Sequence, residues 1–291
     1  MVKIVEPSVE IITDIDGKKI LKTIERAART CYKTEDNITE DTSSAEKMIN
    51  KLIEMDHTAM LEFADIHVIL RCDVGVYKDL SRHRLCSFAI ESTRYCNYSK
   101  DKFGNNINII RPVNMENKEG NPIYEEFLSA MKDMEKHYMK MAKLGCTPDQ
   151  LRMLLPHSTA AYVNMKTNIR EWRHIFGLRC AKAAHPSVRQ IMLMTLNEFH
   201  RRIPLLFNDL YEQYKDDMEE FGIYTDIIEY DKQIPTKEQI EELLKPIQFQ
   251  GSRDDLTIDD TLKRGNYYIK SEDALYFWSG DWQMWWKINE F

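Results

Sequence analysis

Three cationic or titratable side chains, Arg82, His83 and Arg84, stand in a row, and a polar segment that reaches Arg94 follows them. The guanidinium group of arginine is a planar fork of donors that matches a phosphate with two hydrogen bonds. The histidine between the arginines can donate to a second anion or polarise a ring carbonyl. The segment is therefore a candidate site for a phosphorylated ligand. Composition alone favours a solvated basic turn, because most surface clusters of this kind have no catalytic role.

The overall charge limits what this basic segment can bind. The chain has 40 lysine and arginine residues against 47 aspartate and glutamate residues, a net charge of −7, so its average surface repels polyanions. Any nucleotide site must then be local. A nucleic-acid-binding protein that contacts backbone phosphates through Arg82, Arg84 and Arg94 is one alternative, but the acidic charge and the missing binding motif count against it. We therefore expect no nucleic-acid partner.

The six cysteines are scattered along the chain, without a Cys-x-x-Cys pair or a finger-like spacing. This pattern predicts reduced, buried thiols and neither a disulfide framework nor a metal site. The first 13 residues are charged and strand-like, and no later apolar stretch is long enough to cross a bilayer. We therefore expect a cytoplasmic protein without a membrane partner.

The basic segment resembles a known signature. Arg82-His83-Arg84, seven residues and then Ser92 resemble the RHR-x7-S signature of the flavin-dependent thymidylate synthases, and the family's Arg-Tyr follows as Arg94-Tyr95. The resemblance implies reductive methylation of dUMP to dTMP, with 5,10-methylenetetrahydrofolate as carbon donor and with FAD and NADPH as the reducing system. No enzyme thiol is required in this family, and no Pro-Cys dipeptide occurs here.

Further landmarks of the family occur in order on both sides of the signature. The segment from Asp56 to Glu62 resembles an element whose histidine, here His57, lies by the flavin ring. Leu151-Arg152-Met153-Leu154-Leu155-Pro156 resembles an element whose arginine contacts the dUMP phosphate. Gly177-Leu178-Arg179 resembles the element whose arginine holds the uracil ring and favours loss of its N3 proton. These matches make Arg179 the expected catalytic residue.

The resemblance implies two sets of binding residues and no metal ligands. Those implied for the substrate are Arg82, Glu91, Ser92, Thr93, Arg94, Arg152 and Arg179. Those implied for the cofactor are His57, Arg82, His83, Arg84, Asn168, Arg170 and His174. The family builds its FAD site at the subunit junctions of a homotetramer, so a homotetramer is expected.

The chain departs from the family pattern near the signature. Lys78-Asp79 replaces an Arg-Gln pair that touches substrate, and Ala89-Ile90 precedes Glu91 in the spacer. These departures favour, as an alternative, a related pyrimidine-nucleotide one-carbon transferase that uses another nucleotide, such as dCMP, or forms a hydroxymethyl product.

Hydrophobic periodicity predicts the elements that position these residues. Ile66, Val68 and Leu70 alternate with polar residues and predict a strand over residues 66–71. Short strands are also expected over 107–110 and 159–165. A helix is expected to start at a capping box of Ser43 with Glu46. The other expected helices cover residues 20–32, 74–84, 123–144, 148–155, 168–176 and 186–202.

Helices and strands are mixed along the chain, which predicts the α+β class. The resemblance implies a flavin-dependent thymidylate synthase-like fold, with a mixed sheet flanked by long helices. We expect a catalytic domain over residues 1–230. Residues 231–291 are expected to form a small C-terminal appendage, with a short helix capped by Thr236 and Gln239 and an aromatic hairpin between Tyr267 and Trp286.

Overall fold

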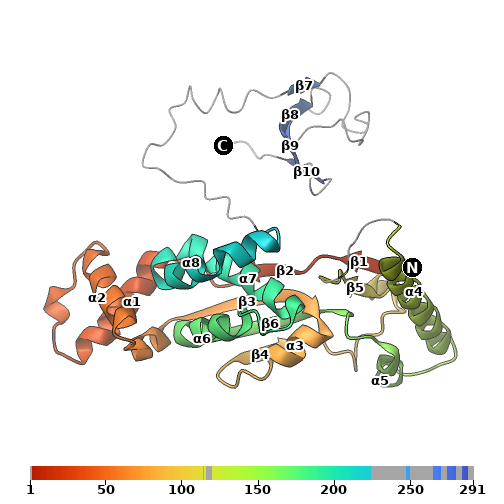
Figure 1. Cartoon of the computed structure of the whole chain (residues 1–291), viewed down its shortest axis with the longest axis horizontal. Coiled ribbons are helices and arrows are strands. Elements are labelled where there is room, and N and C mark those ends of the chain that lie inside the picture. The colour runs from red at the N-terminus through yellow and green to blue at the C-terminus, as the bar shows by residue number, and fades with distance from the viewer. Residues whose placement is uncertain are drawn as a thin grey trace. The chain divides into compact units, whose positions relative to one another are not determined.

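A computed structural model describes residues 2–113, 115 and 120–223 with their side chains, and the backbone of residues 247–249, 265–269, 274–279 and 284–287. The chain divides into two compact units, Met1–Thr225 and Asp226–Phe291. The first unit combines a twisted sheet with several long helices (Figure 1). The predicted α+β class is therefore confirmed.

A four-stranded antiparallel sheet lies at the centre of the first unit, in the strand order β2-β3-β6-β4. Its long inner strands, β3 (Asp65–Asp73) and β6 (Ala160–Asn168), pair along their whole length, while β2 (Ser8–Ile11) and β4 (Ser87–Ile90) are short edges. Parallel pairing occurs in a separate two-stranded sheet of β1 (Lys3–Val5) and β5 (Asn108–Ile110).

Helices surround this sheet, and most of them lie where the sequence predicts them. They are α1 (Gly17–Thr30), η1 (Glu35–Asn37), α2 (Ser43–Glu54), η2 (Thr58–Phe63), α3 (Val74–Leu80), η3 (Asp101–Phe103), α4 (Pro122–Lys143), α5 (Pro148–Leu151), η4 (Arg152–Leu154), α6 (Ile169–Arg179), α7 (Pro186–Arg202) and α8 (Pro204–Glu220), the η elements being 3-10 helices. Among the described residues, no helix combines the length and the apolar composition needed to cross a lipid bilayer.

The main core forms between the sheet and helices α6, α7 and α8. The predicted inner face of β3 is confirmed, since Ile66, Val68 and Leu70 have no exposed surface. Trp172 of α6 is equally buried, and its Nε1–H donates to the carbonyl oxygen of Ile66 over 3.1 Å. The Trp172 ring lies edge-on to Phe199 of α7, with ring centroids 5.0 Å apart. One face of α6 is thus anchored to both the sheet and α7.

A second, smaller core lies under α4. Tyr138 of α4 has 1% of its surface exposed, and it packs with Tyr98, Ile107 and Ile109. The hydroxyl of Tyr138 accepts the backbone N–H of Tyr98 over 3.2 Å, which holds the loop after β4 against the helix. The apolar side of α4 therefore faces its own cluster of loop and strand residues.

The predicted helix boundaries differ from the structure at α1, α2, α3 and α6, and the helix predicted over 148–155 is divided into α5 and η4. Two of these differences have local reasons. Helix α3 ends at Leu80 and not at residue 84, because the Ser81 hydroxyl donates to the carbonyl oxygen of Lys78 over 3.1 Å and competes with the helical pattern. The N-cap of α2 is Thr42 and not Ser43. The Ser43 hydroxyl donates to Asp41 Oδ1 over 2.7 Å, so it is not free to cap the helix.

In the second unit the structure describes four strands, in the order β10-β9-β8-β7. They are β7 (Ile247–Phe249), β8 (Gly265–Ile269), β9 (Ala274–Ser279) and β10 (Met284–Lys287). The pairs β8–β9 and β9–β10 are antiparallel, and this is the segment where the sequence predicts an aromatic hairpin. The helix predicted at Thr236 lies outside the described residues.

Candidate active site

The three signature side chains lie in the turn after α3 and differ in how deeply they are buried. His83 has 7% of its surface exposed, whereas Arg82 and Arg84 are both exposed. The backbone N–H of His83 donates to the carbonyl oxygen of Leu80 over 3.0 Å, which closes the turn and directs the imidazole inward. The histidine therefore lies inside the protein, and the two arginines remain accessible to a ligand.

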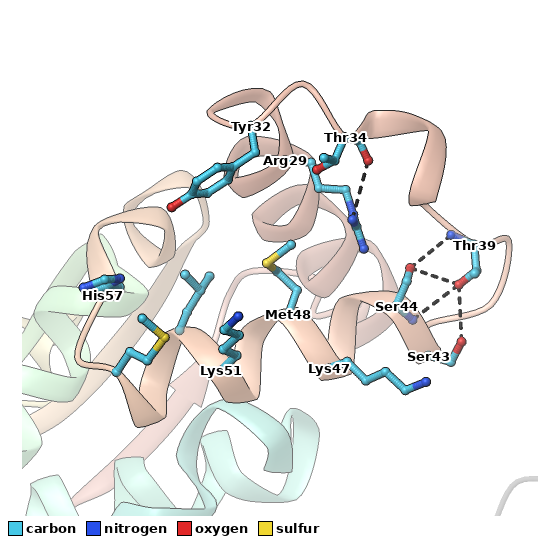
Figure 2. Close-up of a pocket in the computed structure, with 12 residues that line it drawn as sticks. Arg29, Tyr32, Thr34, Thr39, Ser43, Ser44, Lys47, Met48, Lys51 and His57 are labelled. Atoms are coloured by element: carbon cyan, nitrogen blue, oxygen red, sulfur yellow. Dashed lines mark hydrogen bonds between the residues drawn. The ribbon is translucent and has the colours of Figure 1, made fainter.

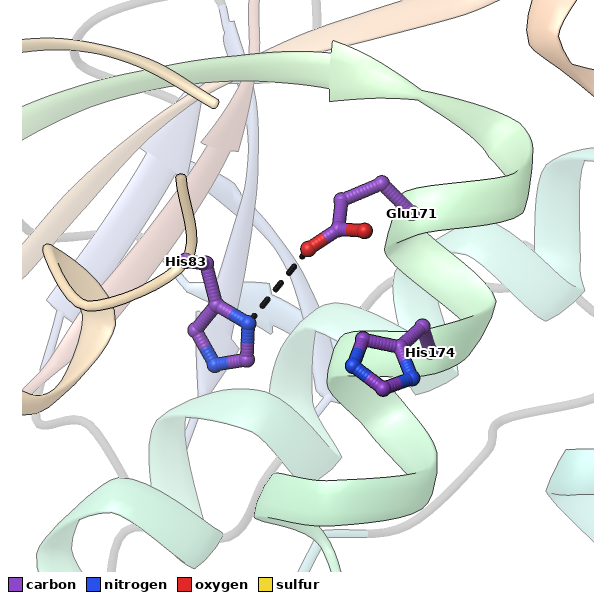
Figure 3. Close-up of side chains that lie close together, drawn as sticks. All are labelled: His83, Glu171 and His174. Atoms are coloured by element: carbon purple, nitrogen blue, oxygen red, sulfur yellow. Dashed lines mark ion pairs between the residues drawn. The ribbon is translucent and has the colours of Figure 1, made fainter. Parts of the chain in front are cut away.

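His83 meets residues of α6 that are more than 85 positions away in sequence. Its Nε2 accepts the Nε–H of Arg179 over 3.0 Å, and its Nδ1 lies 3.4 Å from Glu171 Oε1. Arg179 also donates from Nη2 to the backbone carbonyl of Asp79 over 3.2 Å. The ring of His174 stands edge-on to that of His83, with centroids 6.2 Å apart. Figure 3 shows His83 facing Glu171 and His174 along the helix.

The surroundings of His83 favour its neutral form. Burial lowers the pKa of His83 below its ordinary value, and the positive charge of Arg179 lowers it further. The carboxylate of Glu171 acts in the opposite direction. A neutral imidazole can accept a hydrogen bond from arginine, and an imidazolium cannot.

Glu171 is the one residue of this cluster that the sequence analysis does not single out. Its spacing of three from His174 places both residues on one helix face, and this signal could have found it. Glu171 also fits a purely structural role at the start of a helix, because it stands three positions after Asn168, as in a capping box. The backbone N–H of Glu171 indeed donates to Asn168 Oδ1 over 2.8 Å.

Two residues predicted to bind cofactor make structural contacts in this chain. Asn168 is the N-cap of α6. Arg170 forms an ion pair with Glu62, with Nη1 and Oε1 2.6 Å apart, and this pair joins α6 to η2. Both partners of the pair are about half exposed, so a ligand can still reach them.

Replacing Asn168 by alanine is expected to destabilise the chain by about 1 kcal/mol, because one N–H at the start of α6 loses its acceptor. Asn168→Ser supplies a hydroxyl in the same place and should restore most of the loss. Urea denaturation followed by circular dichroism measures both effects. An alanine variant as stable as the wild type would show that this cap contributes nothing. Loss of flavin binding by a fully stable Asn168→Ser variant would instead show that the amide contacts cofactor.

The residues predicted to bind substrate make different contacts within this chain. The Glu91 carboxylate accepts the Tyr98 hydroxyl over 2.8 Å and the Tyr162 backbone N–H over 3.3 Å, so it braces the loop after β4. Arg94 is exposed and lies over the ring of Tyr95, 5.6 Å from its centroid. Ser92 and Thr93 are half-buried in the same loop, and Arg152 is exposed at the start of η4. In the described part of the chain, no hydrogen bond or ion pair joins Arg94 or Arg152 to His83.

His57 lines a pocket of about 650 Å³ formed by the end of α1, helix α2 and residues of the connection between them. Arg29, Lys47 and Lys51 also line it, and none of its lining residues is acidic. Figure 2 shows His57 at one end and a hydroxyl cluster at the other, where the Thr39 backbone N–H donates to Ser44 Oγ over 3.0 Å. Lys47 and Lys51 form no ion pair with any residue that the structure describes. The pocket therefore suits an anionic ligand.

Comparison with known proteins gives consistent matches. The model of the family described as "Thymidylate synthase complementing protein" matches residues 15–205. The flavin-dependent thymidylate synthase of Corynebacterium glutamicum is 27% identical over 217 residues, which cover 69% of this chain and 83% of that protein. The protein of the same name from Pyrococcus abyssi is 26% identical over 192 residues, which cover 64% of this chain and 76% of that protein.

A solved structure shares the fold. The UMP/dUMP methylase PolB from Streptomyces cacaoi, bound with 5-Br dUMP, superimposes with a TM-score of 0.58 at 20% identity, over 73% of this chain and 97% of that chain. The family match covers well over half of the chain and includes His83, Glu171 and Arg179. The chain belongs to the flavin-dependent thymidylate synthase family.

Proposed function

We propose that this protein methylates dUMP to dTMP, taking the carbon unit from 5,10-methylenetetrahydrofolate and reducing equivalents from NADPH through bound FAD. Membership of the family and the names of its relatives support the reaction. Within the chain, the main support for the proposal is the geometry of Arg179. Hydrogen bonds hold its guanidinium group in place, and some of its N–H donors remain available to a substrate.

The guanidinium of Arg179 has two anchored donors. Nε donates to His83 and Nη2 to the Asp79 carbonyl, while Nη1 makes no hydrogen bond with a described residue. An arginine restrained in this way presents its remaining N–H groups in a fixed direction. It can therefore receive a carbonyl oxygen of a pyrimidine ring without first losing its own conformational freedom.

Arg179 would act on the charge of the ring. C5 of uracil is a weak nucleophile until negative charge on the ring is stabilised, and fixed donors in a partly dry site provide such stabilisation. Arg179 meets the ring oxygen and favours loss of the N3 proton, which increases electron density at C5. His83 supports this role because it is neutral and accepts from Arg179, so no second positive charge competes for the substrate.

The basic pocket beside His57 fits part of the flavin cofactor. FAD carries a pyrophosphate, and the pocket offers Lys47 and Lys51, neither of which forms an ion pair with a described residue, whereas Arg29 is paired with Glu25 over 2.7 Å. Its volume of about 650 Å³ falls in the range of small-molecule sites. When bound, the flavin supplies the hydride that completes the methyl group. This placement agrees with the family's assignment of His57 to the flavin side of the site.

Reversing the charge of Lys47 tests this assignment. Lys47→Glu should weaken FAD binding about tenfold, which corresponds to about 1.4 kcal/mol of lost attraction at a solvent-exposed site. The matched control is Lys18→Glu, which makes the same change in net charge on α1 but lies outside this pocket. Titration of flavin fluorescence at two salt concentrations measures both variants. Equal weakening by the two variants would show that the pocket does not hold the pyrophosphate.

We also propose a homotetramer, because several expected substrate residues stand exposed on one chain. Arg94 and Arg152 are exposed and lack ion-pair partners among the described residues, as expected for groups that complete a site with a neighbouring subunit. The further proposals are a catalytic domain over residues 1–230, an extension over 231–291 and a cytoplasmic location. Light scattering on the purified full chain gives the number of subunits.

A single-turnover assay tests the proposed reaction. The full chain is mixed with FAD, NADPH, methylenetetrahydrofolate and one nucleotide at a time, namely dUMP, UMP or dCMP, and products are identified by mass. We expect dTMP from dUMP. A methylated UMP, a deoxycytidylate product or a hydroxymethyl product would select the variant enzyme, for which the departures at Lys78-Asp79 and Ala89-Ile90 leave room. No turnover of any nucleotide would contradict the proposal.

A further inference from the structure

Glu171 is a buried acid with an unusual setting. It has 8% of its surface exposed, and acidic side chains are rarely so deeply buried unless they are paired. Its partner is the Nδ1 atom of His83, 3.4 Å away. The imidazole thus stands between a carboxylate on one side and the guanidinium of Arg179 on the other.

The hydrogen bond from Arg179 determines where the ring proton must be. Arginine remains protonated in proteins, so its Nε–H can only donate. His83 Nε2 must then be the acceptor and carry no proton. The proton of the neutral ring is consequently on Nδ1, which is the atom that faces Glu171. The partner of one ring nitrogen fixes the tautomer of a histidine and so the role of the other nitrogen.

We propose that Glu171 is a positioning residue for Arg179: its carboxylate fixes the Nδ1–H tautomer of His83, and Nε2 of that ring orients the guanidinium toward the substrate. This inference rests on the proposed function in one respect, namely that Arg179 is the residue that binds the pyrimidine ring. It gives a task to a residue that neither the family signature nor the other family landmarks in this sequence include.

A metal site is the rival interpretation of the same three side chains. One ligand atom each from His83, Glu171 and His174 lies within 4.8 Å of the others. A cation on Nδ1 of His83 would leave the ring proton on Nε2, where it would point at the N–H of Arg179. Two donors would then oppose each other at 3.0 Å, so the observed contact favours the proton and not the metal.

The first test observes the tautomer directly and needs no activity. Imidazole nitrogen NMR on the full chain, with His83 assigned by its loss in His83→Gln, distinguishes Nδ1–H from Nε2–H. We expect the Nδ1–H form in the wild type. Glu171→Gln should keep it, because the amide oxygen still accepts from Nδ1. Glu171→Ala should shift His83 toward the Nε2–H form and thereby break the contact with Arg179.

The second test measures turnover of dUMP. Glu171→Ala should lower kcat/KM about 10- to 100-fold, the usual cost of losing a residue that orients a functional histidine. Glu171→Gln should recover most of that loss. Asp209→Asn is the matched control, because it neutralises an acid that pairs with Arg173 of the same helix, away from His83. It should leave both the tautomer and kcat/KM unchanged.

The pH profile separates positioning from general loosening of the fold. Protonation of His83 removes the acceptor of Arg179, so activity should fall at acidic pH. The charged groups that face His83 are Glu171, His174 and Arg179, all on α6, and of these only Glu171 raises the pKa of His83. Loss of its charge should therefore move the acidic limb of the pH–activity profile to lower pH in Glu171→Gln, the variant that keeps the contact with Arg179. A variant that only weakens folding would lower activity without moving the limb.

Three results would overturn the inference. They are an Nε2–H tautomer in the wild type, an unchanged tautomer in Glu171→Ala, and stoichiometric Zn²⁺ binding by the wild type that Glu171→Ala abolishes. If the wild-type chain converts no nucleotide, the proposed function fails separately. The tautomer measurement alone then decides whether Glu171 orients Arg179 through His83.

Discussion

Replacing Arg179 by alanine is expected to lower kcat for dUMP about 10²- to 10³-fold, the usual cost of losing one fixed donor to a developing negative charge. The variant should still fold, because Arg179 is only partly buried and its two hydrogen bonds lie at the end of α6. Arg179→Lys keeps the charge but loses the planar fork and the Nε–H that His83 accepts. It should therefore recover only a small part of the activity.

Single-turnover kinetics with bound flavin, combined with a thermal melt, measure this effect. The control is Arg201→Ala, which removes an exposed arginine that pairs with Glu198 on the surface of α7. We expect the control to retain full activity. An Arg179→Ala variant with the kcat and KM of the wild type would show that another group stabilises the ring.

Replacing Trp172 by alanine is expected to destabilise the first unit by about 3–5 kcal/mol, the range for deleting a large buried aromatic side chain. Trp172 has no exposed surface, and its ring packs against Phe176 and Phe199, with centroids 5.7 and 5.0 Å away. The substitution also leaves the carbonyl oxygen of Ile66 without the indole N–H. The cavity and the lost donor act together on the same helix that carries Glu171, the immediate neighbour of Trp172.

Urea denaturation followed by far-ultraviolet circular dichroism is the suitable measurement. Trp172 is one of five tryptophans, and the other four lie beyond residue 277, so fluorescence would mix signals from two units. The control Trp172→Phe keeps an aromatic ring and should cost less than the alanine variant. A loss below about 1 kcal/mol for Trp172→Ala would show that α6 can repack without its anchor.

Elements whose residues carry their own periodicity could be predicted from the sequence. Strand β3 is one, because Ile66, Val68 and Leu70 alternate, and helix α7 is another, because its start and end match the prediction. Strand β4 could not be predicted from hydrophobic periodicity. Its four residues have no buried face of their own and become a strand by pairing with β6, as Phe88 does with Met165. Such pairing depends on a partner that is distant in sequence.

Helix α8 is absent from the sequence prediction although its signal exists. Leu206, Leu210, Tyr214 and Met218 are buried and repeat every four residues, as expected for a helix with one face in the core. It begins at Pro204, directly after α7, with only Ile203 between them. The proline is compatible with the first turn of a new helix, which the prediction did not use.

The site was predictable in part. The resemblance singled out His83 for the cofactor and Arg179 for the substrate, and the structure places the two side chains in contact. The role of Glu171 could not be deduced, because it depends on a turn that delivers His83 to a helix 88 residues further along the chain. Arg94 and Arg152 show the converse limit, since matching a motif does not establish which groups these side chains contact.

The contact between Arg179 and Asp79 involves the main-chain carbonyl and not the carboxylate. Every amino acid supplies that carbonyl, so the side chain at this position can drift during evolution while the arginine keeps its anchor. The aspartate that replaces the family's usual glutamine is thus compatible with an unchanged hold on Arg179. What selection must preserve here is the turn where α3 stops, in which the same oxygen also accepts the backbone N–H of Arg82 over 3.3 Å. Relatives with other residues at position 79 but the same helix end should retain the same arginine geometry.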